Sequence, residues 1–258
     1  MIFDTHAHYD DEAFDNDRDE LLEKLPEAGI GRVVNIAASP QSIEDCLSLA
    51  HKYEHVYCAL GIHPEHCAEM TEELLEEIRV KLSEKKVVAV GEIGLDYYWP
   101  EPDPEIQRYW FARQLQLAAE EDMPVVVHSR EAAADTMRIM KENHAEKVGG
   151  VVHCYSYSAE LAKEYVKMGF YIGIGGVLTF KNARKLVEVA GEIPLEHLLL
   201  ETDCPYRAPV PYRGKRNSSL YLPYVVTKLA EIKGIPGEEV IRVTEQNAER
   251  MYRLQDKD

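Results

Sequence analysis

Eight short runs of apolar, often β-branched residues alternate along this chain with longer amphipathic stretches. The runs are IFDTHAH (2–8), RVVNIAA (32–38), VYCALGIHP (56–64), VVAVGEIGLD (87–96), PVVVHSR (124–130), GVVHCYS (150–156), FYIGIGG (170–176) and HLLLETDCP (197–205). Several are apolar almost throughout, which is typical of parallel strands that are buried on both faces. This alternation therefore predicts a parallel sheet covered by helices.

The stretches between the runs carry helix start signals. Ser39 followed by Pro40, and Asp103 followed by Pro104, predict N-caps with proline at the first helical position. Ser158 predicts a further N-cap in the same way.

Eight strand–helix units in 258 residues match an α/β protein of the (β/α)₈ TIM-barrel type. A doubly wound open sheet is the main alternative, and eight consecutive units make it the weaker one. No segment has the composition of a linker, so we expect a single domain over residues 1–258.

The composition, with 45% hydrophobic and 29% charged residues, is that of a soluble globular protein. No run approaches the roughly 20 apolar residues of a membrane span, and Asp4 and His6 stand where a signal peptide would have a basic start. Five scattered cysteines without CxxC spacing are expected of reduced thiols in the cytoplasm. We therefore expect a cytoplasmic protein with no membrane contact and no obligate protein partner.

Side chains that bind metals stand at or just past the predicted strand ends. They are His6, His8, His63, Glu92, His128, His153, Glu201 and Asp203. In a (β/α)₈ barrel the active site is built at the C-terminal ends of the strands, so these side chains should converge. Each alone has a plainer explanation, such as a hydrogen-bonded core histidine, but buried together they would be costly without a cation.

Even four of these imidazoles with two or three of the carboxylates exceed the ligands of one tetrahedral zinc ion. We therefore predict two divalent cations bridged by a carboxylate. Glu92 is the natural bridge, because its strand lies between the two groups of histidines. The metal stays open among Mg, Mn and Zn, since imidazole favours zinc or manganese whereas nucleases commonly work with Mg²⁺.

The chain resembles the TatD family of metal-dependent hydrolases, which includes deoxyribonucleases. The matching stretches are DTHAH (4–8), GIHPE (61–65), VGEIGLDYY (90–98), PVVVHSRE (124–131), VVHCYS (151–156), YIGIGG (171–176) and LLLETDCPY (198–206). The resemblance implies a TIM barrel that holds one or two divalent ions. It places one ion on His6, His8, Glu92 and Asp203, and a second on Glu92, His128 and His153. Family members are often described as magnesium-dependent 3′→5′ exonucleases on DNA.

Catalysis is expected to depend on Glu92, Asp203 and His63. Asp203 can ligate one ion and also accept the proton of the attacking water. His63 lies outside the ligand set, where it can hold the scissile phosphate or protonate the leaving oxygen. Glu201 and Asp4 are expected to orient the ligands from behind.

The net charge of −17 argues against a surface that coats nucleic acid, because phosphate binding needs positive charge. Residues 204–230, however, contain no Asp or Glu. The expected substrate-binding residues are Arg130, Arg207, Arg213 and Lys215. Tyr206 and Tyr212 are candidates for stacking on bases. Such a local patch suits a nucleic-acid end, whereas the plainer interpretation is a solvated loop.

Three functions remain compatible with the sequence. The first is a phosphodiesterase, specifically a deoxyribonuclease that acts as a 3′→5′ exonuclease on single-stranded DNA. The second is a barrel hydrolase of amide, ester or lactone bonds; such relatives often bridge their metals with a carboxylated lysine on the fourth strand, where this chain has Glu92. The third is a non-catalytic metal-binding scaffold, against which the complete ligand set argues. The choice between DNA and RNA, the polarity of degradation and the oligomeric state stay open.

Overall fold

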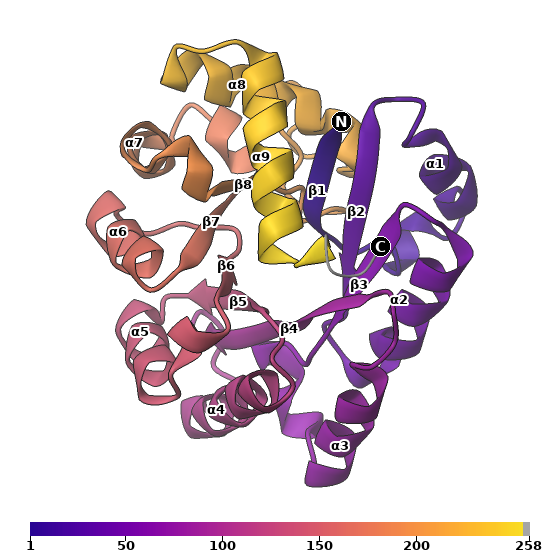
Figure 1. Ribbon diagram of the computed structural model, residues 1–258, viewed down its shortest axis with the longest axis vertical. Helices are drawn as coiled ribbons and strands as arrows, with labels where there is room; N and C mark the ends of the chain where they lie inside the picture. The colour runs from indigo at the N-terminus through magenta and orange to yellow at the C-terminus, as the bar shows by residue number, and fades with distance from the viewer. Residues whose placement is uncertain (255–258) are drawn as a thin grey trace.

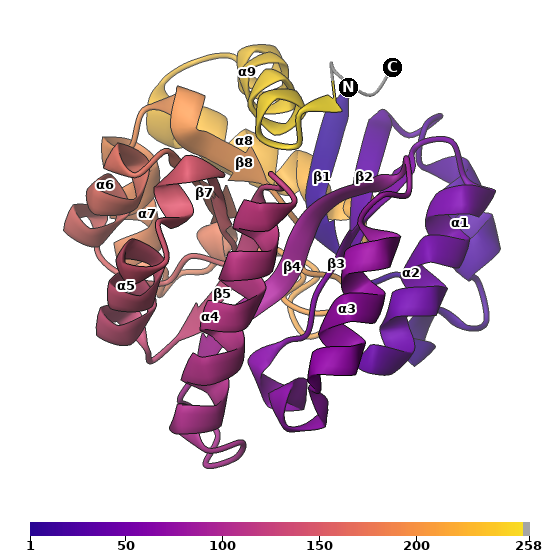
Figure 2. The same ribbon diagram turned by 60° about the horizontal axis from the view of Figure 1, so that its bottom comes forward.

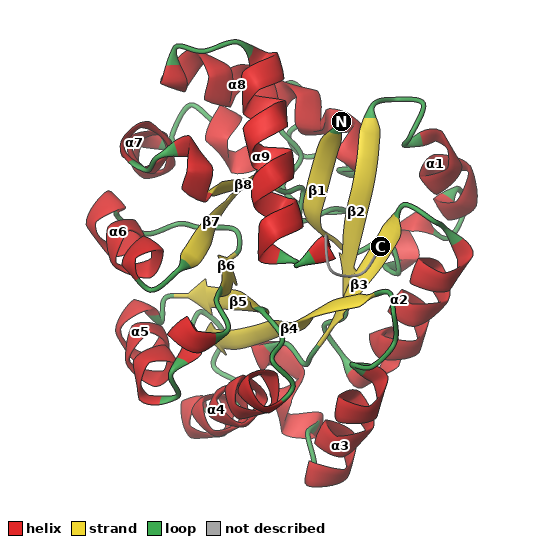
Figure 3. Cartoon of the chain, in the orientation of Figure 1, coloured by secondary structure: helices red, strands yellow, loops and turns green. Residues whose placement is uncertain are grey.

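The structure, a computed structural model, describes residues 1–254, so the end of the predicted single domain at 255–258 lies outside the described residues. Eight parallel strands form one sheet in the order β1 to β8. Figure 1 shows the strands in a ring, and Figure 3 shows helices around it, with the last helix lying across one end of the ring. The prediction of a (β/α)₈ barrel is confirmed, and the open sheet is wrong.

The strands are β1 (Ile2–Ala7), β2 (Ile30–Ile36), β3 (Val56–Leu60), β4 (Val87–Asp96), β5 (Val125–Arg130), β6 (Gly150–Val152), β7 (Phe170–Ile174) and β8 (Leu198–Leu200). The helices are α1 (Arg18–Lys24), α2 (Pro40–Lys52), α3 (Glu72–Lys81), α4 (Pro104–Glu120), α5 (Ala133–Glu142), α6 (Ala159–Lys167), α7 (Arg184–Glu192), α8 (Leu222–Lys233) and α9 (Gly237–Met251). None of them, within residues 1–254, is both long enough and apolar enough to cross a membrane.

The predicted caps begin these helices as expected. Ser39 accepts a hydrogen bond from the N–H of Ser42 at the start of α2. Asp103 accepts one from Glu105 at the start of α4, and Ser158 caps α6. Side-chain oxygens therefore satisfy N–H groups that a helix leaves unpaired in its first turn.

Helix α9 packs against the barrel at the end where the strands begin (Figures 1 and 2). Ala248 and Met251 of α9 join a buried cluster with Phe3 of β1 and Val126 of β5. The hydroxyl of Tyr252 donates a hydrogen bond to the Thr5 carbonyl over 2.7 Å. Because apolar packing fills this end, the opposite end of the strands is the one that remains for a polar site.

The barrel closes between β1 and the segment that follows β8. An isolated bridge pairs Ala7 with Cys204, and the N–H of His8 donates to the Cys204 carbonyl over 2.8 Å. The N–H of Asp203 donates to the His6 carbonyl over 2.9 Å. This closure lies at the C-terminal end of β1, so it brings three of the predicted metal ligands to one place.

Candidate metal centre

The predicted ligands converge at the C-terminal end of the barrel. Glu92 and His128 lie within strands β4 and β5, and His6 lies within β1. His8, His153 and Asp203 stand just beyond their strands, because β1, β6 and β8 end at Ala7, Val152 and Leu200. Cys154 and Asp203, which follow β6 and β8, have positive φ angles of +44° and +56°. Such left-handed conformations of non-glycine residues gather at functional sites.

Glu92 lies at the centre of the cluster and is 3% exposed. Its Oε1 lies 2.6 Å from Nε2 of His153 and 2.8 Å from Nδ1 of His128. Its Oε2 lies 3.3 Å from Nε2 of His6 and 3.7 Å from Nε2 of His8. Burial alone would raise the pKa of this carboxyl, but the surrounding imidazoles outweigh burial and hold the pKa well below its usual value. Glu92 thus stands ionised between two pairs of histidines.

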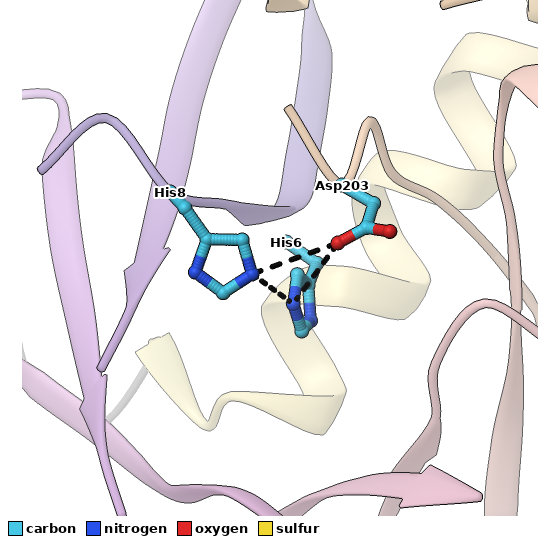
Figure 4. Close-up of side chains that lie close together, drawn as sticks. All are labelled: His6, His8 and Asp203. Atoms are coloured by element: carbon cyan, nitrogen blue, oxygen red, sulfur yellow. Dashed lines mark hydrogen bonds and ion pairs between the residues drawn. The ribbon is translucent and has the colours of Figure 1, made fainter. Parts of the chain in front are cut away.

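The first pair is His6 and His8, whose Nε2 atoms lie 3.1 Å apart. Figure 4 shows both rings turned toward Asp203. Asp203 Oδ1 lies 3.6 Å from Nε2 of His8 and 3.9 Å from Nε2 of His6. Nδ1 of His8 lies 2.9 Å from the Ile36 carbonyl, which can only accept, so Nδ1 carries a proton. In the neutral ring the Nε2 lone pair of His8 is thereby left to face the site, as a metal ligand requires.

The second pair is His128 and His153, with Nδ1 of one 3.3 Å from Nε2 of the other. Nε2 of His128 lies 2.9 Å from Oδ2 of Asp96. Burial opposes a charge on His128, but its hydrogen bonds to Asp96 and Glu92 outweigh burial and raise its pKa to about 9. A carboxylate behind an imidazole is the arrangement that fixes the tautomer of metal-binding histidines. From the sequence, Asp96 could equally line the mouth of the barrel or belong to a loop; it lies four residues after Glu92, and the structure places it in β4 against His128.

Three buried polar atoms behind these pairs have no hydrogen-bond partner among the described residues: Nδ1 of His6, Nδ1 of His153 and Oε2 of Glu201. The rings of His6 and His153 stack with centroids 3.8 Å apart. One potential ligand atom from each of His6, His153 and Glu201 lies within 4.8 Å of the others. Glu201 Oε1 accepts from the N–H of Cys154 over 2.5 Å, and burial raises the Glu201 pKa to about 7. The position suits the predicted orienting role of Glu201, which stays a prediction.

His63 joins the cluster from the loop after β3. Its Nδ1 accepts a hydrogen bond from the N–H of Glu65 over 3.1 Å, so in the neutral ring Nε2 carries the proton. Nε2 lies 3.7 Å from Oε1 of Glu92. Burial lowers the pKa of His63 to about 3, which favours that neutral ring. A protonated Nε2 can donate a hydrogen bond but cannot ligate a metal, in keeping with a place outside the ligand set.

Asp4 is fully buried. Its carboxylate contacts backbone N–H groups next to the metal centre. The carboxylate accepts hydrogen bonds from the N–H groups of His6, over 3.3 Å, and Thr202, over 3.0 Å. It also accepts from the hydroxyls of Thr202 and Ser219, over 2.7 Å and 2.6 Å. Asp4 therefore joins β1 to the segment after β8, and the structure gives no hydrogen bond from it to the imidazole ring of a ligand.

The predicted substrate-binding residues divide into two groups. Arg130 and Arg207 line a cavity of about 580 Å³ above the metal centre. Nε of Arg207 also lies 2.8 Å from Oδ2 of Asp203. Arg213 instead lies over the ring of Phe180, with its guanidinium carbon 4.3 Å from the centroid. Lys215 lines an adjoining surface cavity, which shares Asp11 and Tyr206 with the central one.

The two candidate stacking tyrosines also differ in position. Tyr206 lines the central cavity and is 55% exposed. Tyr212 stacks on Tyr221, with ring centroids 4.2 Å apart, so one of its faces is already covered. Trp99 also lines the cavity, but it lies in a loop where no periodic pattern could have identified it.

The chemistry of the donors fits divalent cations. Imidazole nitrogens converge on carboxylate oxygens in the groups His6–His8–Asp203 and His6–His153–Glu201, which share His6. In a third group Glu92 and His128 meet beside His63. Nitrogen and carboxylate oxygen are the ligands that zinc, manganese and magnesium sites use. The buried nitrogens and carboxylates gathered here therefore form a site that a cation would stabilise.

Comparisons with known proteins agree with this site. A family model described as TatD related DNase matches residues 3–253. YabD of Bacillus subtilis, described as an uncharacterised metal-dependent hydrolase, is 43% identical over 254 residues, which cover 98% of this chain and 100% of that protein. YcfH of Escherichia coli K12, described in the same words, is 34% identical over 257 residues, covering 98% and 96%. The crystal structure of YjjV, a TatD homologue from Escherichia coli K12, has a TM-score of 0.92 at 33% identity, covering 98% of both chains.

The fold, the site and these relatives together define a metal-dependent hydrolase built on a TIM barrel. Within that class, the chain belongs to the TatD family. The resemblance seen in the sequence is thereby confirmed.

Proposed function

We propose that this protein is a deoxyribonuclease that hydrolyses phosphodiester bonds with two divalent cations, acting as a 3′→5′ exonuclease on single-stranded DNA. The observation that carries the proposal is the placement of Glu92. One of its oxygens faces His128 and His153, and the other faces His6 and His8. A carboxylate that presents each oxygen to a separate pair of nitrogens is suited to bridge two ions, which is the arrangement of two-metal phosphodiester chemistry.

Divalent ions bound here would supply the Lewis acidity that activates water and offsets charge on the phosphoryl oxygens. The protein would hold them on His6, His8, Glu92 and Asp203, and on Glu92, His128 and His153. Asp203 presents Oδ1 to this centre and can accept the proton of the attacking water. His63 presents a donor Nε2, which can hydrogen-bond a phosphate oxygen or the leaving oxygen.

The cavity above the centre supports a phosphate ester with a free end. Arg130 and Arg207 line it, and guanidinium groups are suited to phosphate because they form paired hydrogen bonds. Its volume of about 580 Å³ lies in the range of small-molecule pockets, ~300–1,000 Å³. A few nucleotides fit such a space, whereas a long duplex does not. The matching family description names a DNase, which favours DNA over other esters.

End-labelled DNA tests this proposal directly. Single strands labelled at the 3′ or the 5′ end are incubated with the enzyme and Mg²⁺, Mn²⁺, Zn²⁺ or EDTA, and the products are resolved by length. We expect metal-dependent loss of single nucleotides from the 3′ end. Parallel assays on an acyl ester and a lactone examine the alternative hydrolase. Turnover of those substrates without any cleavage of DNA would contradict the proposal.

We also propose that the protein works in the cytoplasm. The five cysteines are free thiols, and four of them are buried, which fits a reducing compartment. Fractionation of the native host, with detection by antibody, tests this placement.

A further inference from the structure

Two exposed aromatic side chains stand on the rim of the cavity above the metal centre. Trp99 follows β4 and is 49% exposed, and Tyr206 follows β8 and is 55% exposed. Both line the same cavity. Because the eight strands follow one another in order around the barrel, β4 and β8 lie on opposite sides of it. The two aromatic side chains therefore face the cavity from opposite rims.

Neighbouring side chains hold both aromatics in place. The ring of Trp99 packs edge-on against Tyr98, with centroids 4.8 Å apart. The guanidinium carbon of Arg130 lies 3.7 Å from the centroid of Tyr98. This cation–π contact connects the loop that carries Tyr98 and Trp99 to Arg130 at the end of β5. The hydroxyl of Tyr206 donates to Oδ2 of Asp11 over 2.9 Å. Contacts of this kind organise a stacking surface before a ligand arrives.

Acidic and basic side chains lie on different sides of the rim of the cavity. Three carboxylates, those of Asp10, Asp11 and Glu65, line the cavity on the side of β1 and β3. The nearby Arg18 guanidinium donates to the backbone carbonyls of Asp10 and Asp11. The cations of the cavity, Arg130 and Arg207, come from the side of β5 and β8. Carboxylates repel a phosphate backbone, so the β1–β3 side is the less favourable path for a strand. The cavity therefore suits the end of a strand that leaves on the β5–β8 side.

We propose that Trp99 and Tyr206 form a base-stacking clamp for the terminal nucleotides of a single strand. The proposal rests on the proposed phosphodiesterase function and adds the feature that selects the substrate. Aromatic side chains stack on any base, so the clamp recognises unpaired bases without reading their sequence. Trp99 supplies the larger ring on the β4 side, and Tyr206 supplies the second surface on the β8 side. Bases within a duplex are already stacked and cannot enter between them.

Fluorescence tests the contact without relying on turnover. The chain has two tryptophans, Trp99 and Trp110, so the W110F variant leaves Trp99 as the only tryptophan reporter. Single-stranded octanucleotides with hydrolysis-resistant phosphorothioate linkages are titrated into the Mg²⁺-loaded protein. Matched strands carry an abasic residue at the 3′ or the 5′ end. We expect quenching of Trp99 by the normal strand and much weaker quenching by one of the abasic strands. If W110F does not fold, the quenching of wild-type fluorescence minus the quenching of W99F fluorescence gives the contribution of Trp99.

Affinity measurements test the energetic role of the clamp. Stacking on one aromatic side chain changes affinity by about 5- to 150-fold. We expect W99A and Y206A to lose affinity for the normal strand by that factor, and to discriminate less between normal and abasic ends. Y206F should keep most of the affinity, because it retains the ring and loses only the hydrogen bond to Asp11. Y109A is the matched control, since Tyr109 is 52% exposed but does not line the cavity.

The outcomes separate this inference from the proposed function. Equal binding of normal and abasic ends by the wild type, or unchanged affinity in W99A and Y206A, would overturn the clamp even if DNA is hydrolysed. Absence of binding to any strand would overturn it as well. Base-dependent quenching of Trp99 without DNA hydrolysis would support the clamp and count against the proposed reaction alone.

Discussion

The carbonyl oxygen of His6 accepts a hydrogen bond from the N–H of Asp203 over 2.9 Å. This contact is part of the closure of the barrel, and it also places the Asp203 carboxylate beside the imidazoles of His6 and His8. Asp4 reinforces the contact by accepting from the N–H groups of His6 and Thr202. The first and last ligands along the chain are therefore brought together by the step that closes the sheet, so the metal centre and the fold depend on each other.

Replacing Glu92 with glutamine should nearly abolish turnover while the barrel stays folded. A neutral amide offers one oxygen and removes the charge that faces both histidine pairs. Substitutions of groups behind a metal ligand cost about 10- to 100-fold, and loss of a bridging ligand should cost more. The measurements are kcat/KM, metal content and the circular dichroism spectrum. Glu84→Gln, at an exposed carboxylate with a 48% exposed side chain, is the control. A metal-loaded E92Q protein with most of the wild-type activity would exclude a bridging role.

The convergence of His6 and His8 could be predicted because a strand sets it. Alternation places residues two apart on one face, and their Nε2 atoms do lie 3.1 Å apart. The order of strands in a barrel further predicts that β4, β5 and β6 deliver Glu92, His128 and His153 to the same end.

Other contacts depend on geometry that no local pattern specifies. His128 meets Asp96 because β4 pairs with β5 in the register that sets Gly94 beside His128. Arg207 pairs with Asp203, and Arg213 lies over Phe180, although both were expected to serve the substrate in the same way. Long loops after strands set these positions, and their conformation follows from packing with distant residues. A sequence therefore shows that a loop is positively charged, but it does not show which residues or ligand the charged side chains contact.

Asp96→Asn should weaken metal binding through the tautomer of His128. Nε2 of His128 lies 2.9 Å from Oδ2 of Asp96, and an amide nitrogen placed there would donate to Nε2. The ring proton would then move to Nδ1, the atom that faces Glu92. We expect metal affinity to fall by about 10- to 100-fold, measured by calorimetric titration. Asp122→Asn, at an exposed carboxylate, is the control. Equal affinities in D96N and D122N would show that the contact does not set the tautomer.

Metal binding should release protons at neutral pH. In the metal-free protein, burial opposes a charge on His8, but the hydrogen bond with Asp203 and nearby carboxylates outweigh it and raise its pKa to about 10. His128 is raised to about 9. Both imidazoles are thus protonated at pH 7 and must lose that proton to ligate. Apparent metal affinity should therefore rise with pH and level off only above about 10, the higher of the two pKa values.

Calorimetry in buffers of different ionisation enthalpy counts these protons. We expect the binding enthalpy at pH 7 to depend linearly on the buffer, with a slope of about two protons for a fully loaded site. Lys24→Met, which removes an exposed cation paired with Glu20, should leave the slope unchanged. A slope of zero would mean that His8 and His128 are already neutral before the metal binds.

Gly173→Ala should disturb the centre through Glu201. A Cβ atom at position 173, in strand β7, would lie 2.2 Å from Oε2 of Glu201. Overfilling a packed interior costs about 1–3 kcal/mol, so we expect a lower melting temperature and weaker metal binding. The double variant G173A/E201A removes the clash together with the carboxylate. Its loss of stability should be smaller than the sum of the two single losses, because residues in contact are not additive. Additive losses would show that Gly173 and Glu201 act separately.

The predicted substrate-binding residues that line the central cavity should affect DNA affinity differently from those that lie outside it. Arg130 lines the central cavity, whereas Arg213 lies over Phe180 outside it. Arg130→Ala should therefore weaken binding of a short single strand and reduce the slope of log affinity against log salt by about one. Arg213→Ala removes the same charge from the chain and serves as the matched control.

We expect Arg213→Ala to weaken binding mainly of longer strands, whose backbone can reach the loop after β8. Both variants are compared by fluorescence anisotropy with strands of increasing length. An equal loss for both variants on the shortest strand would show that net charge, and not the position of the guanidinium, governs binding.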